Sequence, residues 1–102
     1  MGKFSRDKGY RVENNLRKQA LMHEDIECYR VPLSGGASIK GDLVVNKSGE
    51  EKWILEVKCR ANGFKSIYDW FEDNDGLVIK ADNKKPLVVL DFDDFLELVA
   101  RR

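Results

Sequence analysis

The chain has 102 residues, of which 42% are hydrophobic and 35% charged, and its 18 basic residues balance 18 acidic ones. This length fits one domain with one hydrophobic core, and the composition is that of a globular chain, which excludes a disordered segment. No apolar run approaches the roughly 18 residues of a membrane span, and the polar N-terminus has no signal-peptide core, so we expect a cytoplasmic protein that does not enter a membrane.

The first predicted element is a helix over residues 5–23, with Ser5 as its N-cap. Its apolar residues recur every fourth position, at Val12, Leu16 and Ala20. Glu13 borders this apolar stripe, so its carboxylate extends to solvent, pairs with a basic residue or points into a site. Position alone leaves these three interpretations open.

Three strands are predicted next, over residues 27–33, 40–45 and 52–60. A loop that contains Ser34, Gly35 and Gly36 joins the first two strands, and glycines let a backbone approach a phosphate closely. Such a loop is also an ordinary connection. A polar turn over 46–51 with Ser48-Gly49 predicts a hairpin between the second and third strands.

The strand over 52–60 carries charged residues in an apolar run. Side chains alternate faces along a strand, so Glu56 and Lys58 are predicted to be neighbours on one face. A strand this apolar is expected to be central and buried, where a carboxylate is costly unless it is paired or holds a metal. Asp42 on the adjoining strand is a second oxygen ligand, and the set suits Mg²⁺-assisted attack on phosphate. The alternative is an ordinary ion pair at a strand end.

The rest of the chain predicts a helix over 64–71, a hairpin of strands 77–81 and 87–90, and a last helix that begins at Asp91. The first of these helices has an aromatic stripe that we expect to pack on the sheet. Asp91, Asp93 and Asp94 form an acidic cluster, which capping at the start of the last helix explains without a metal. The resulting order of elements predicts an α/β domain over residues 1–102, with the first three strands antiparallel and helices against the sheet.

Two further features of the composition bear on function: the distribution of charge along the chain, and the few cysteine and histidine residues. Residues 1–40 hold eight basic against five acidic residues, whereas residues 61–102 hold six against nine. The basic residues of the first helix form either a phosphate-binding surface or a solvated helix face. Cys28, Cys59 and the single His23 are too few for a disulfide scaffold or a zinc site, and we expect both cysteines to be reduced.

Two segments carry a resemblance to a known family. Gly41-Asp42-Leu43-Val44-Val45 followed by Ile54-Leu55-Glu56-Val57-Lys58 resembles the core of the PD-(D/E)xK nucleases, with Gly41 where the motif has proline. Residues 8–13 at the start of the first helix and 30–36 before the Asp42 strand narrow the resemblance to small Holliday junction resolvases of the archaeal type, which also occur in phages. The match covers about residues 5 to 60.

The resemblance implies a catalytic set and its metal. Asp42 and Glu56 bind Mg²⁺, or Mn²⁺ in its place, together with the main-chain carbonyl of Val57. Lys58 orients the attacking water or stabilises the phosphate in the transition state. Glu13 becomes an active-site acid, and Ser34 helps to bind and cleave DNA. The expected DNA contacts are Lys8, Arg11, Lys18, Ser34 and Arg60.

The resemblance also implies a restriction-endonuclease-like mixed sheet flanked by helices in a single compact domain, and a homodimer that cuts four-way DNA junctions. Several aromatic residues beyond the needs of one small core are consistent with a dimer: Trp53, Tyr68, Trp70, Phe92 and Phe95. Two other functions stay open. One is a nicking or repair nuclease of the same fold, and the other is a non-catalytic module that binds DNA or inhibits.

Overall fold

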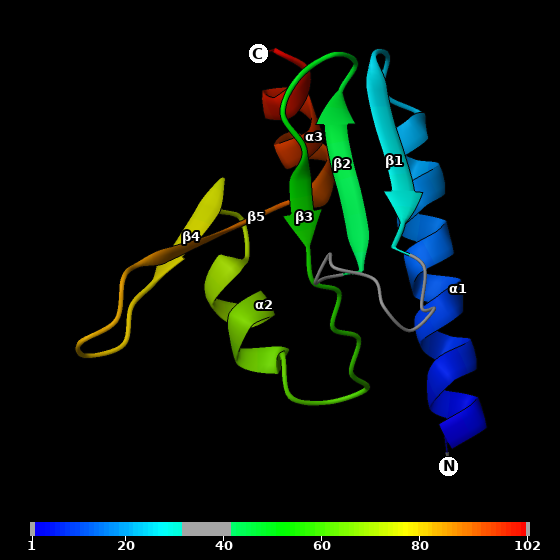
Figure 1. The fold of residues 1–102 in the computed structure, drawn as a ribbon. Coiled ribbons are helices and arrows are strands. Elements are labelled where there is room, and N and C mark those ends of the chain that lie inside the picture. The colour runs from blue at the N-terminus through cyan, green and yellow to red at the C-terminus, as the bar shows by residue number, and fades with distance from the viewer. Residues whose placement is uncertain (1, 32–41, 102) are drawn as a thin grey trace.

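The computed structural model describes residues 2–31 and 42–101, with side chains from residue 8 onward in the first helix. Figure 1 shows a three-stranded antiparallel sheet in the order β1-β2-β3, backed by two helices. These elements are α1 (Gly2–Leu21), β1 (Ile26–Arg30), β2 (Leu43–Lys47), β3 (Trp53–Leu55) and α3 (Phe92–Ala100). The predicted α/β class and the antiparallel order of the first three strands are confirmed.

The hydrophobic core lies between the sheet and the two helices on its one face. It is made of side chains from α1, β1, β2 and α3: Ala20, Ile26, Cys28, Leu43, Val45, Leu96 and Val99. The predicted stripe of α1 contributes Ala20 and Leu16, and period-two alternation in β2 sends Leu43 and Val45 to this face. Burial raises the pKa of the Cys28 thiol, and neither Cys28 nor Cys59 forms a disulfide.

The start of α3 is fixed by its capping residue. The Asp91 carboxylate accepts hydrogen bonds from the main-chain N–H groups of Asp93 (2.9 Å) and Asp94 (3.3 Å). Asp93 in turn lies 2.9 Å from His23 Nε2, beyond the end of α1, and hydrogen bonds from His23 and Gln19 lower the pKa of Asp93. The acidic cluster is therefore a cap and a link between α1 and α3, as predicted for the cap.

A second unit extends from the side of the first. It consists of α2 (Lys65–Phe71) and the antiparallel hairpin of β4 (Gly76–Ile79) and β5 (Leu87–Leu90), as Figure 1 shows. The hairpin is confirmed. The described residues, however, form two antiparallel sheets in place of one mixed sheet: β4 pairs with β5, and neither strand joins β3.

Two predicted details of the helices differ in the structure. Ser5 is not an N-cap, because α1 begins at Gly2 and Ser5 lies inside the helix. Helix α2 contacts β4, and none of its residues is buried, so its aromatic stripe does not pack on the first sheet.

In the described part of the chain, no helix has the length and apolar character that a membrane crossing requires.

The third strand differs from its prediction more than any helix does. The predicted strand over 52–60 is only Trp53–Leu55 and forms an edge of its sheet, while β2 is the buried central strand. The ladder ends because the main-chain N–H of Asp42 donates to the Leu55 carbonyl (2.8 Å), and the next available N–H, that of Val57, donates to the Asp42 side chain. Among the described residues, the Asp42 side chain is thus the hydrogen-bond acceptor of the main chain just beyond Leu55.

Candidate functional site

Asp42 is the residue on which the candidate site is built. Its main-chain carbonyl accepts from Val31 N–H (2.9 Å) and its N–H donates to Leu55 (2.8 Å), so its backbone lies between the ends of β1 and β3. Its carboxylate Oδ2 accepts from the Val57 N–H at 2.7 Å. A bond this short to an ionised acceptor is of the strong, charge-assisted kind. The sequence-predicted pair of Asp42 and the 56–58 segment is thereby brought together.

Glu56 and Lys58 lie on either side of Val57, with their side chains turned the same way. Lys58 Nζ is 3.2 Å from Glu56 Oε2, and both side chains are 57% exposed. Val57 is turned inward and packs against the core. The alternation predicted for these residues is confirmed even though they follow the strand rather than belong to it. The predicted burial of Glu56 and Lys58 is wrong, because β3 is an edge strand and leaves the segment in contact with solvent.

Glu13 lies on α1, where it pairs with Arg30 of β1. Its Oε1 accepts from Arg30 Nε at 3.0 Å, and the two side chains are only 16% and 20% exposed. The Arg30 guanidinium also stacks 3.9 Å from the centroid of the Tyr10 ring. Of the three interpretations that the sequence left open for Glu13, pairing with a basic residue is the one the structure shows.

Arg30 and Tyr10 were not predicted as site residues. Arg30 is the last residue of β1 and directly precedes Val31, which bonds to Asp42. Its guanidinium therefore lies at the end of the sheet where Asp42 also lies. The sequence does contain Arg30 within the matched segment 30–36, but its partner Glu13 is 17 positions away, so only the packing of α1 on β1 reveals the pair.

The predicted DNA-binding residues are spread over several elements. Arg11 and Lys18 are exposed and Lys8 is half-buried on α1. At about 100° per residue these three lie within one side of the helix, while Glu13 lies on a different side, next to the apolar stripe. Arg60 is exposed and its guanidinium donates to the Cys59 carbonyl at 3.4 Å. Ser34 lies outside the described residues, as do Gly35, Gly36 and Gly41.

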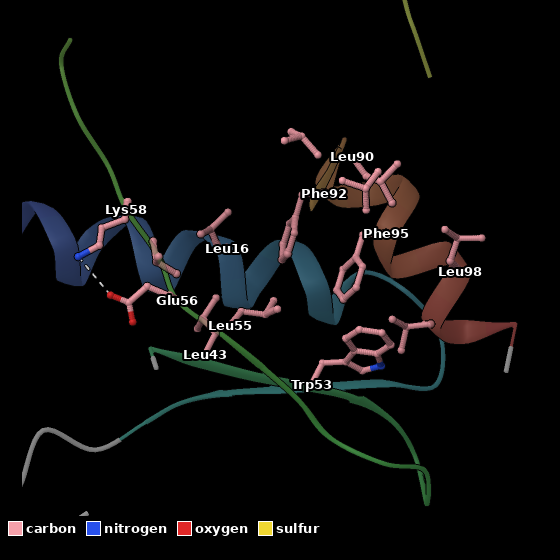
Figure 2. Close-up of a pocket in the computed structure, with 14 residues that line it drawn as sticks. Leu16, Leu43, Trp53, Leu55, Glu56, Lys58, Leu90, Phe92, Phe95 and Leu98 are labelled. Carbon is pink, nitrogen blue, oxygen red and sulfur yellow. Dashed lines mark ion pairs between the residues drawn. The ribbon is translucent and has the colours of Figure 1, made fainter. Parts of the chain in front are cut away.

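A cavity of about 700 Å³ opens beside Glu56 and Lys58. Figure 2 shows this ion pair at one end of the cavity and Trp53, Phe95 and Leu98 at the other. Its walls come from β3, β5 and α3 with Leu16 and Leu43 behind, and Glu56 and Lys58 are the charged residues among them. Trp53 packs edge-to-face on Phe95, with ring centroids 5.4 Å apart.

The residues around Asp42 offer oxygen ligands of the chemical type that a hard divalent cation takes. Two carboxylates, Asp42 and Glu56, and the Val57 carbonyl are the type of ligand that Mg²⁺ prefers, and Mg²⁺ commonly takes one or two carboxylates, with waters and substrate phosphates completing its shell. Across residues 2–31 and 42–101, no three His, Cys, Asp or Glu side chains gather closely enough to hold a metal. Since Glu13 is bound to Arg30, the fitting set has two carboxylates rather than three.

Comparison with known proteins gives no family for the chain: no protein-family model, curated protein or solved structure matches it.

Proposed function

We propose that this chain is a Mg²⁺-dependent DNA endonuclease of the PD-(D/E)xK type, selective for branched DNA in the manner of Holliday junction resolvases. The observation that supports this best is the 2.7 Å hydrogen bond from Val57 N–H to the Asp42 carboxylate. It joins the Asp of the motif to the Glu-Val-Lys segment, so the residues that the resemblance assigns to catalysis lie close together in the fold. Phosphodiester hydrolysis requires hard oxygen ligands and a cation at one place, and these residues supply both.

Each residue of the set has a distinct role in this proposal. Asp42, Glu56 and the Val57 carbonyl hold Mg²⁺, for which Mn²⁺ can substitute. When bound, the ion supplies Lewis-acid activation of water and neutralises phosphate charge. With Glu56 as a ligand of the ion, Lys58 would direct its ammonium toward the attacking water or the phosphate. The exposure of Glu56 and Lys58 suits this role, because a DNA backbone must reach both side chains.

Glu13 is the third acid of the proposed site, and Arg30 offsets its charge. Three carboxylates would otherwise repel the phosphates that the enzyme must bind. The Glu13–Arg30 pair is mostly shielded from solvent, which makes its attraction stronger than that of a surface pair. Lys8, Arg11, Lys18, Ser34 and Arg60 are the proposed DNA contacts, and phosphate is their target, since basic side chains bind it without regard to sequence.

The proposed substrate is a four-way junction and the proposed active form a homodimer in the cytoplasm. A junction presents two strands related by two-fold symmetry, so two sites are needed, and a two-fold dimer provides one in each subunit. The resemblance of residues 5 to 60 to the resolvases supports this choice. A nicking or repair nuclease with the same catalytic residues would cut other DNA.

A non-catalytic DNA-binding module is the second candidate, and one observation favours it. All three acids already have protein partners: Asp42 bonds to Val57, Glu56 to Lys58 and Glu13 to Arg30. Acids held in this way can be structural. The two candidates differ in one measurable property, which is whether the bound DNA is cut.

The test is incubation of the purified protein with labelled four-way junction and with matched linear duplex, with and without Mg²⁺. We expect cleavage of the junction that requires the metal and is lost in Glu56→Gln. Glu24→Gln, an exposed acid in the turn after α1, is the matched control and is expected to cut normally. Junction binding without cleavage in Mg²⁺ or Mn²⁺ would support the non-catalytic module. Equal cutting of duplex would replace the resolvase by the broader nuclease.

A further inference from the structure

The cavity beside Glu56 and Lys58 has the size and lining of a small-molecule site. Its volume of about 700 Å³ lies within the roughly 300–1,000 Å³ of pockets that enclose drug-sized ligands. Among the described residues that line it, all except Glu56 and Lys58 are apolar. Phosphodiester hydrolysis makes no use of an apolar hollow, because the DNA backbone is charged and hydrated. The cavity therefore fits a ligand other than DNA.

The end of the cavity away from the ion pair is apolar and reaches solvent. Trp53 is 39% exposed and Leu98 49%, and Figure 2 shows both side chains at that end. Phe95 packs edge-to-face on the Trp53 ring, which fixes an aromatic wall there. A ligand chain that covers Trp53 and Leu98 removes apolar surface from water, which favours binding.

The spacing of Trp53 and Glu56 sets the length of the ligand chain. They are three residues apart on an extended backbone, which advances about 3.3 Å per residue, so about 10 Å separates them. Carbon–carbon bonds of about 1.5 Å that meet at about 111° advance about 1.25 Å each, so an alkyl chain of about eight carbons spans this distance. The cavity thus fits a chain of medium length with a polar group at one end.

The Glu56–Lys58 ion pair determines which polar group fits. Lys58 Nζ lies 3.2 Å from Glu56 Oε2, and both side chains are 57% exposed, so the pair can shift at small cost to admit a ligand. An ammonium has three N–H donors and a carboxylate two acceptor oxygens, so each can bind a further group. A lone carboxylate at Lys58 would face Glu56, and a lone ammonium at Glu56 would face Lys58, so each would be repelled. A group that carries both charges meets an opposite charge at each.

We propose that this cavity binds an amphipathic zwitterion, namely an α-amino acid with a long apolar side chain. Its ammonium contacts Glu56, its carboxylate contacts Lys58, and its side chain extends past Leu55 to Trp53. The bound head group occupies Glu56 and Lys58, so it excludes metal and phosphate from them and inhibits the proposed cleavage. This inhibition rests on the proposed function, whereas binding itself does not.

The test measures binding by the fluorescence of Trp53, without DNA or metal. Trp70→Phe removes the other tryptophan of the chain, which does not line the cavity, and all proteins in the test carry this change. The probe is 2-aminodecanoic acid, whose alkyl side chain has the required length. Decanoate lacks its ammonium, nonylamine lacks its carboxylate, and alanine has the same head group with almost no chain. We expect 2-aminodecanoic acid to bind about tenfold more tightly than decanoate or nonylamine, and alanine not to bind.

Variants locate the two ends of the ligand. Leu98→Arg places a charge at the apolar end and is expected to weaken binding of 2-aminodecanoic acid about tenfold or more. Leu21→Arg is the matched control, because Leu21 is 47% exposed and does not line the cavity, and it is expected to leave binding unchanged. Glu56→Gln should bind decanoate as tightly as 2-aminodecanoic acid, and Lys58→Met should bind nonylamine as tightly, because each variant lacks the partner of one ligand charge. Circular dichroism checks that each variant is folded.

Three outcomes would overturn the proposal. One is the absence of a saturable fluorescence change with 2-aminodecanoic acid up to about 1 mM, the upper limit of useful affinity. Another is equal affinity for decanoate or nonylamine before Glu56 or Lys58 is changed, which would mean that a single charge is recognised. The third is unchanged binding in Leu98→Arg, which would place the ligand outside the cavity. None of these outcomes depends on whether the protein cuts DNA, so a failure of the proposed function is distinguishable from a failure of this site.

Discussion

Replacing Asp42 tests the structural and chemical roles of the site at the same time. Asp42→Asn keeps a side-chain oxygen that can accept the Val57 N–H but removes the charge, and Asp42→Ala removes the acceptor altogether. A hydrogen bond to an ionised group contributes about 1.5–3 kcal/mol and a neutral one about 0.5–1.5 kcal/mol. We therefore expect Asp42→Asn to lower the free energy of unfolding by about 1 kcal/mol, and Asp42→Ala by about 1.5–3 kcal/mol.

Both substitutions are expected to abolish Mg²⁺-dependent cleavage, because each removes a proposed metal ligand. Affinity for DNA should stay equal or rise, since a negative charge that repels phosphate is lost. At about 4–8 °C per kcal/mol for a domain of this size, the melting temperature should fall by about 4–8 °C in Asp42→Asn and by about 6–24 °C in Asp42→Ala.

Thermal unfolding followed by circular dichroism and cleavage of labelled junction are the two assays. Asp82→Asn and Asp82→Ala, in the exposed turn between β4 and β5, are the matched controls and should change neither. If Asp42→Ala melted no lower than Asp82→Ala, the hydrogen bond to Val57 would not hold the segment as argued. If Asp42→Asn cut DNA within tenfold of the wild type, Asp42 would not be a metal ligand.

Three further predictions concern other parts of the molecule. Lys58→Ala should slow cleavage about 10²- to 10³-fold, the usual loss of one transition-state stabiliser, and a change in affinity alone would make Lys58 a phosphate anchor instead. Neutralising Arg11 together with Lys18 should make the slope of log affinity against log salt shallower by up to about 2, and an unchanged slope would mean that this side of α1 does not meet DNA. In the folded protein a thiol reagent should modify Cys59 and not Cys28, whose thiol is buried and has a raised pKa; equal rates for both cysteines would contradict the packing of β1.

Local patterns predicted the elements whose causes are local. The Asp91 cap, the β4–β5 hairpin and the apolar stripe of α1 all follow from residues that are close together in the sequence. Alternation also predicted correctly that Glu56 and Lys58 share a side, because period two holds for any extended backbone.

What the sequence did not predict depends on contacts between distant residues. The third strand stops at Leu55 because Asp42, 15 positions before Val57, takes the Val57 N–H with its side chain. Glu13 pairs with Arg30 because α1 packs on β1. Periodicity predicted the α2 helix correctly. It does not show whether another part of the protein covers the apolar face of a helix, and in the structure Tyr68 and Trp70 are exposed to solvent. The expectation for Ser34 falls outside the described residues.

The composition of the core has a consequence for synthesis of the chain. Leu96 and Val99 of α3 close a core whose other members come from α1, β1 and β2. During translation, Leu43 and Val45 of the sheet therefore lack their contacts with α3 until α2 and the hairpin have been synthesised and α3 has left the ribosome. At about 5–20 residues per second this delay lasts several seconds, during which the open edge of β3 can pair with other chains. A ribosome-bound intermediate that ends before Phe92 is thus expected to recruit chaperones.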